Sequence, residues 1–127
     1  MKIEIPKINL NNNIYPKNSS KNNIDKNIII MNESSMPDEE SGVVIIGAHS
    51  GTGRYAYFKD LNKLEIDDEV IINYKNKKYT YKVIYYYLDK KDGSIDINRK
   101  NKRLYLYTCN PSDKNNFLVI VCEQKEK

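Results

Sequence analysis

The chain has no tryptophan, two phenylalanines, one histidine and two cysteines among its 127 residues. Two cysteines are too few to make a disulfide scaffold in a domain of this size. With one histidine and no Cys-x-x-Cys pair, the usual spacing of zinc ligands cannot be written down. No apolar run approaches the ~18 residues needed to cross a bilayer. These absences argue against a disulfide-rich protein, a structural zinc site and a membrane-spanning segment within these residues.

The N-terminus has no signal-peptide pattern and begins directly on a strand-like segment, residues 3–8. Two interpretations of this start are open. The chain is either a cytosolic protein or a domain separated from an N-terminal membrane anchor.

Basic residues outnumber acidic ones by 21 to 17, which gives a formal net charge of +4. The lysines are scattered, and the basic runs at residues 75–78 and 99–103 are typical of turns between strands. No basic stripe interleaved with aromatic residues occurs, so nucleic acid is not an expected partner. A mild attraction to anionic polymers is expected from the charge.

Segments rich in Ile, Val and Tyr alternate with clusters of Asn, Asp, Gly and Lys, which predicts an all-β fold. The spacing indicates a single domain over residues 1–127, a closed or nearly closed barrel or a sandwich. The predicted strands are residues 2–8, 28–31, 42–48, 69–74, 78–88, 103–109 and 117–123. The helical candidates are residues 19–24 and 56–64.

The single histidine, His49, follows the apolar run 43–48, and Cys109 ends a second apolar run at 104–108. A cysteine becomes a good nucleophile as a thiolate, and histidine is its usual partner. Strand ends that open on loops commonly carry catalytic groups. Two alternatives are open at this point: Cys109 is a buried core residue, or it forms a disulfide with Cys122. Cys122 lies within an apolar run and is predicted to be buried.

The motifs around His49 and Cys109 resemble those of the sortase family. Gly-Ala-His-Ser-Gly at residues 47–51, with segments 56–64 and 66–70, is similar to the signature around the family's catalytic histidine. Tyr-Leu-Tyr-Thr-Cys at residues 105–109 resembles its Thr-Leu-x-Thr-Cys motif. Ile-Pro-Lys-Ile at residues 5–8 resembles the start of its barrel. The ordered set covers nearly the whole chain.

This resemblance implies a closed eight-stranded β-barrel with one or two short helices, and a cysteine transpeptidase of Gram-positive bacteria. Such an enzyme cleaves a Leu-Pro-x-Thr-Gly-like sorting signal of a surface protein between Thr and Gly. Cys109 would be the nucleophile that holds the thioacyl intermediate, and His49 the general acid and base. The acceptor would be an amine of a cell-wall precursor or a pilin. The family works without a cofactor at the outer face of the cell membrane, held by an N-terminal anchor.

One departure concerns the family's third residue, an arginine that steadies the oxyanion. Phe117 takes its position, Asn116 stands just before it, and no arginine follows Arg103. A missing oxyanion donor costs about a hundredfold to a thousandfold in rate. Three interpretations are open: Asn116 or Lys114 donates instead, Arg54 reaches across the groove, or the domain is a weakly active or inactive sortase-fold peptide-binding module.

The substrate groove is expected to have apolar walls from residues 83–88 and a polar wall from the loop 89–102. Calcium is a weaker expectation, because acidic loop residues bind it in some sortases. The acidic candidates are Asp38, Glu39, Glu40, Asp92 and Asp96. The short chain and loop favour a class D-like sortase. Class C is disfavoured because no Asp-Pro-aromatic lid motif is found.

Overall fold

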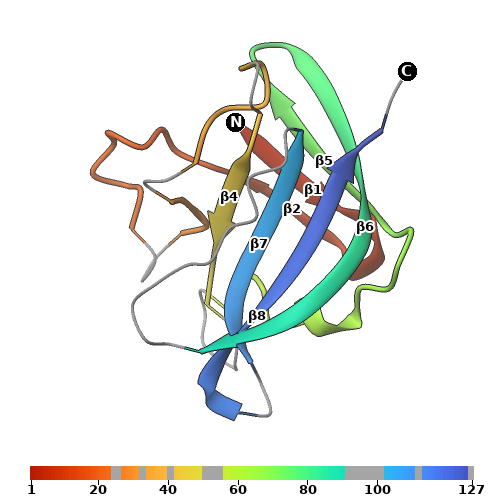
Figure 1. Cartoon of the computed structure of the whole chain (residues 1–127). Coiled ribbons are helices and arrows are strands. Elements are labelled where there is room, and N and C mark those ends of the chain that lie inside the picture. The colour runs from red at the N-terminus through yellow and green to blue at the C-terminus, as the bar shows by residue number, and fades with distance from the viewer. Residues whose placement is uncertain are drawn as a thin grey trace.

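The computed structural model describes residues 1–23, 27–31, 34–39, 42–49, 56–90, 102–110 and 113–125, with the backbone alone at 89, 90, 109, 110 and 113–115. Within these ranges the chain folds into strands and two single-turn 3₁₀ helices (Figure 1). The strands are β1 (Lys2–Ile5), β2 (Leu10–Asn13), β3 (Ile29–Ile30), β4 (Val44–Gly47), β5 (Glu69–Tyr74), β6 (Lys77–Lys90), β7 (Arg103–Asn110) and β8 (Asp113–Gln124). The helices are η1 (Pro6–Ile8) and η2 (Leu61–Lys63).

All eight strands belong to one sheet, in the order β2-β1-β5-β6-β8-β7-β4-β3. The pairs are antiparallel except β4 with β7, which run parallel. The two outer strands, β2 and β3, are not paired with each other in the described part of the chain. The sheet is therefore curled but open, where the sequence predicted a closed barrel. Both edge strands are short and β2 is Asn-rich, as is common for edges that avoid further pairing.

The two faces of the sheet carry separate apolar clusters. The interior cluster, which includes Ile3, Ile72 and Leu106, fills the space inside the curl. The second cluster covers the other face of β4, β7 and β8. Its buried members are Val43, Ile45, Tyr105, Tyr107, Val119 and Val121, with Met31, Ile84, Tyr85, Tyr87 and Phe117 packed against them. Strands β4 and β7 are buried on both faces, which explains their uninterrupted apolar sequences.

Strand β6 changes face part-way along its length. Tyr81 and Val83 belong to the interior cluster, whereas Tyr85 and Tyr87 pack on the second cluster. The register with β8 shifts between Val83 and Tyr85, which pair with successive residues of β8. A bulge of this kind adds one residue and turns the following side chains to the opposite face. It explains why the alternation of this Tyr-rich segment is blurred.

The helix predictions were wrong in type. Residues 56–64 form turns and then η2, because their backbone bonds run from residue i to i−3, as from Leu61 N–H to the Phe58 carbonyl and from Leu64 N–H to the Leu61 carbonyl. A nine-residue segment is too short to hold an α-helix by itself. The described part of residues 19–24 forms turns, and Ile24 lies outside it. No helix among the described residues has the length and apolarity to cross a membrane.

Two strand boundaries at the N-terminus also differ from expectation. β1 ends at Ile5 because Pro6 begins η1, whose C-cap Asn9 takes a left-handed φ of 55°. The chain then returns as β2, Leu10–Asn13, which was missed because asparagine is depleted in strands.

Tyr81 provides a test of the interior packing. Its side chain is fully buried, and its hydroxyl has no hydrogen-bond partner among the described residues. We expect Tyr81→Phe to leave the free energy of unfolding unchanged or to raise it by about 1 kcal/mol, because an unsatisfied polar group is removed while the ring stays. Tyr105→Phe is the matched control, since its hydroxyl bonds Arg103, and should lower stability by about 1 kcal/mol. Urea denaturation measures both, and a clear loss in Tyr81→Phe would contradict the assignment.

Candidate active site

His49 is held by its backbone at the exit of β4. The preceding residue, Ala48, donates its N–H to the carbonyl of Tyr107 at 3.2 Å, and the His49 carbonyl accepts the N–H of Phe58 at 3.0 Å. The first bond ties the strand exit to β7, and the second ties it to the turn before η2. The His49 side chain is half-buried. The imidazole therefore stands on a fixed backbone with access to solvent.

The register between β4 and β7 brings His49 and Cys109 together. These strands lie side by side (Figure 1), and Gly47 pairs with Tyr107. His49 and Cys109 each follow that pair by two residues. Because neighbouring strands are about 4.8 Å apart, the two residues lie at the same end of the sheet, one after β4 and one in β7.

The second cluster extends toward both positions. Cys109 pairs directly with Phe117 across β7 and β8, and directly opposite residues lie on one face of a sheet. Phe117 packs on the second cluster, with its ring centroid 6.2 Å from that of Tyr107 at an interplanar angle of 79°. On β4, Ile45 belongs to the same cluster, and the face that carries Ile45 and Phe117 is the site face. The Cys109 side chain itself lies outside the described residues.

The candidates for the oxyanion donor that replaces the expected arginine do not all lie beside Cys109. Phe117, at the position of the expected arginine, lies on the site face opposite Cys109. Asn116 precedes it in regular pairing with β6, so alternation places Asn116 on the opposite face, with Leu118 of the interior cluster. Arg54 and the Lys114 side chain lie outside the described residues.

Arg103 is the one arginine that the structure describes, and it lies at the other end of β7. Its guanidinium donates to the Tyr85 hydroxyl at 3.2 Å and stands 5.7 Å from the centre of that ring. Cys109 lies six positions further along the strand, about 20 Å away. Arg103 therefore cannot replace the expected arginine beside the thiol.

The expected apolar wall at residues 83–88 is only partly on the site face. The bulge turns Tyr85 and Tyr87 toward the second cluster. Tyr86 and Leu88, which alternate with them, are 60% and 55% exposed. The loop that follows, expected to form the polar wall, lies outside the described residues over 91–101. Ile84 and the rings of Tyr85 and Tyr87 thus supply the part of the wall that the structure shows.

Cys122 is a buried residue of the interior cluster, which confirms the sequence prediction. It pairs with Leu104, five residues from Cys109 along β7. That separation, about 16 Å, excludes a disulfide, which needs Cα atoms within about 7 Å. Burial also raises the pKa of the Cys122 thiol, so the neutral form dominates at pH 8.

This environment predicts that Cys122 resists alkylation in the folded protein. Iodoacetamide at about pH 8.5 reacts with the thiolate, whose pKa is near that value in a free cysteine. Intact-protein and peptide mass spectrometry should find Cys122 unmodified until urea unfolds the chain, while Cys109 is modified at once. Equal labelling of both thiols in the folded state would contradict this prediction.

The acidic residues do not form a metal site in the described part of the chain, where no group of three or more His, Cys, Asp or Glu side chains comes together. Asp38 pairs with Lys75 at 3.7 Å, and a carboxylate oxygen of Glu39 accepts the Met36 N–H. Glu40, Asp92 and Asp96 lie outside the described residues.

Comparison with known proteins identifies the family. The sequence-family model of the sortase domain matches residues 3–125. The chain belongs to the sortase family. This membership confirms the resemblance seen in the motifs and makes the protein, in general terms, a sortase-type transpeptidase. No curated protein matches the chain.

Solved sortases share the fold of this one. Sortase C1 from Streptococcus agalactiae is 28% identical with a TM-score of 0.82, and the match covers 99% of this chain and 67% of that one. Sortase C from Clostridium perfringens, solved with the C-terminal cell wall sorting motif, is 26% identical with a TM-score of 0.82, over 99% and 70%. Sortase C-1 from Actinomyces oris, at 20% identity, a TM-score of 0.83 and coverage of 99% and 73%, shows the fold alone. These three are class C proteins, and the class D-like assignment of this chain stays a prediction.

Proposed function

We propose that this sortase is a cysteine transpeptidase in which Cys109 attacks a Leu-Pro-x-Thr-Gly-like sorting signal between Thr and Gly. The observation that supports the proposal is the parallel register of β4 and β7, in which Gly47 pairs with Tyr107 two residues before His49 and Cys109. Such a placement suits a thiol that needs an imidazole within reach. Cys109 lies within β7, and His49 follows the end of β4 with its backbone carbonyl bonded to the Phe58 N–H.

The reaction proceeds in two acyl transfers. The Cys109 thiolate adds to the Thr carbonyl carbon, and the Thr–Gly amide bond breaks as the His49 imidazolium gives its proton to the leaving amine. A thioester to Cys109 remains. An incoming amine then attacks that thioester, loses its proton to His49, and displaces the Cys109 thiolate.

The second cluster supplies an apolar floor beside this pair. Tyr85, Tyr87 and Phe117 are only partly buried there. Aromatic faces of this kind pack well against leucine and proline side chains. This surface therefore favours a peptide whose first residues are apolar, such as Leu-Pro, over a peptide with charged residues there.

The proposed partners are supported by the family and by one relative. The C. perfringens sortase C was solved with a cell wall sorting motif, which supports a sorting-signal peptide as the substrate here. The acceptor is proposed to be an amine of a cell-wall precursor or of a pilin. The working place is proposed to be the outer face of the cell membrane.

A second candidate function is a sortase-fold module that binds a peptide with little or no turnover. It is favoured by one observation, the phenyl ring of Phe117 directly opposite Cys109. A phenyl ring donates no hydrogen bond to an oxyanion, whereas a guanidinium donates two at once.

The experiment that separates these functions is mass spectrometry of the purified chain after incubation with a set of sorting-signal peptides. A transpeptidase gains the mass of the acyl fragment on Cys109, and an added amine removes it. A binding module holds the peptide without any gain in covalent mass. A chain that neither binds nor is acylated by any member of the set would contradict both proposals.

A further inference from the structure

A row of polar side chains crosses four strands at the end of the sheet that carries the β5–β6 hairpin. Lys2 of β1 pairs directly with Asn13 of β2 on one side and with Asn73 of β5 on the other. Asn73 in turn pairs with Lys78 of β6. Directly opposite residues share a face, so the order across the sheet is Asn, Lys, Asn, Lys, without a carboxylate.

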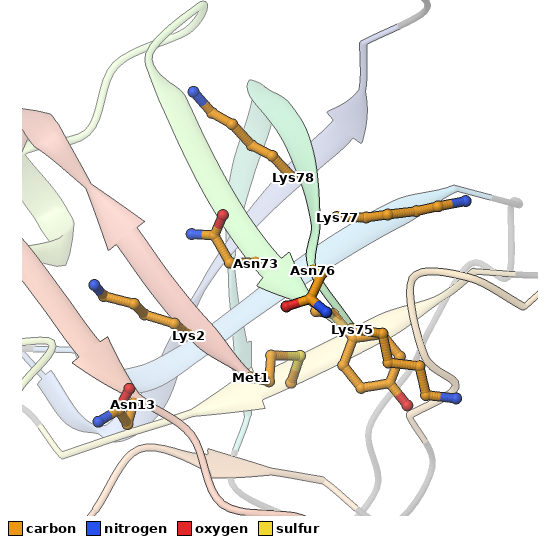
Figure 2. Close-up of a pocket in the computed structure, with 9 residues that line it drawn as sticks. Met1, Lys2, Asn13, Asn73, Lys75, Asn76, Lys77 and Lys78 are labelled. Atoms are coloured by element: carbon orange, nitrogen blue, oxygen red, sulfur yellow. The ribbon is translucent and has the colours of Figure 1, made fainter.

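These side chains line a hollow of about 420 Å³. Figure 2 shows that Lys2 and Lys78 extend to one side of the hairpin, with the Asn73 amide between them, while Lys75 and Lys77 extend to the other. The hairpin turn is Lys75-Asn76, where both residues take a positive φ. One tip therefore presents ammonium groups in two directions.

The positive charge of this tip is only partly neutralised. Lys75 pairs with Asp38 at 3.7 Å, and Lys2 approaches Glu4 at 4.0 Å. Lys77 and Lys78 are exposed, and no carboxylate of the described residues lies within 4 Å of either. Lysines gathered this way make a positive patch on a protein whose net charge is only +4.

The basic tip lies far from the candidate active site. β6 begins at Lys77 in the hairpin, and its other end, at Asp89, pairs with Phe117 beside Cys109. Figure 1 shows the β5–β6 hairpin at the top, and the end of β7 and the beginning of β8 at the bottom. A surface that binds this tip would therefore leave His49 and Cys109 at the end of the sheet that points away from it.

We propose that this basic tip, formed by Lys2, Lys75, Lys77 and Lys78, docks on the phosphate headgroups of an anionic lipid bilayer. Its ammonium groups spread in two directions instead of converging on one point, which suits many headgroups in a plane rather than one compact phosphate. Tyr74, over whose ring Lys75 stands at 5.3 Å, adds the amphipathic aromatic side chain common at membrane interfaces. Lipid binding is independent of turnover, so it is testable whether or not the transpeptidase proposal holds.

The test is co-sedimentation of the whole chain with vesicles of phosphatidylcholine alone and with about a third phosphatidylglycerol. We expect binding only to the anionic vesicles, weakening as salt rises. Each lysine near such a surface contributes about fivefold in affinity, so Lys77→Gln/Lys78→Gln should bind about twenty- to thirtyfold more weakly. Lys2→Gln/Lys75→Gln is a second variant of the same tip and should also bind more weakly.

The charge-matched control is Lys7→Gln/Lys63→Gln, which removes two exposed lysines from η1 and η2. It should lose at most about threefold in affinity, because these lysines lie away from the tip. Equal losses in the control and in the tip variants would overturn the proposal, since net charge alone would then explain binding. Absence of binding to anionic vesicles would also overturn it. The proposal would also be overturned if calorimetry showed that the chain binds soluble polyphosphate but does not bind the anionic vesicles.

Discussion

Cys109→Ala is expected to end both the cleavage of sorting-signal peptides and the appearance of a thioacyl adduct. Removal of a catalytic nucleophile costs a factor of roughly 10³ or more, because the remaining groups of the site cannot form the covalent intermediate. In this fold the loss should come without unfolding, since Cys109 lies at the sheet edge, close to the end of β7. A fluorogenic peptide measures the rate, and circular dichroism checks the fold.

The matched control for this variant is Cys122→Ala. Cys122 is fully buried in the interior cluster, on a different face from Cys109. Its replacement removes one sulfur from the core, so we expect a stability loss of about 1 kcal/mol with the adduct on Cys109 retained. Full cleavage by Cys109→Ala, or an adduct that moves to Cys122, would remove Cys109 from the mechanism.

The sequence signals that predict this pair are local. The apolar runs before His49 and Cys109 are long enough to be strands, and strands buried on both faces keep such runs unbroken. The parallel pairing that brings the two strand ends together is a long-range property. The sequence alone did not predict this pairing: the sortase motifs led only to the expectation that the two residues act together. The register of Gly47 with Tyr107 gives that expectation a physical basis.

The features that the sequence could not predict depend on how the strands pair and on the register of that pairing. The bulge between Val83 and Tyr85 decides which tyrosines of β6 face the site, and no residue type marks it. The open edge of the sheet depends on how β2 and β3 are placed in space, and β2 itself has the composition of a loop. Asn116 and Phe117 are neighbours in sequence but take opposite faces, which only the pairing with β6 and β7 reveals.

That difference of face makes Phe117 the informative position. A donor at residue 117 would lie opposite Cys109, where we propose that the tetrahedral oxyanion forms, whereas a side chain at residue 116 starts on the interior side of the sheet. Phe117 instead gives its ring to the aromatic surface beside Tyr107. The chain thus has an apolar contact at the position where the sortase motifs led us to expect the hydrogen-bond donor.

Phe117→Arg is therefore expected to raise the rate of peptide cleavage by about a hundredfold, because one oxyanion donor contributes about a hundredfold to a thousandfold. The gain should appear mainly in kcat, since the donor acts on charge that forms in the transition state. Phe117→Lys adds the charge without the planar fork and should gain less, while Phe117→Leu keeps an apolar side chain and should leave the rate unchanged. Loss of the ring contact with Tyr107 should lower stability by about 1 kcal/mol in all three variants, which thermal melting measures.

A cleavage rate for Phe117→Arg at or below that of the original chain, with the fold intact, would contradict this prediction. It would mean that another group already donates to the oxyanion. Arg54→Gln would then be the variant expected to lose activity.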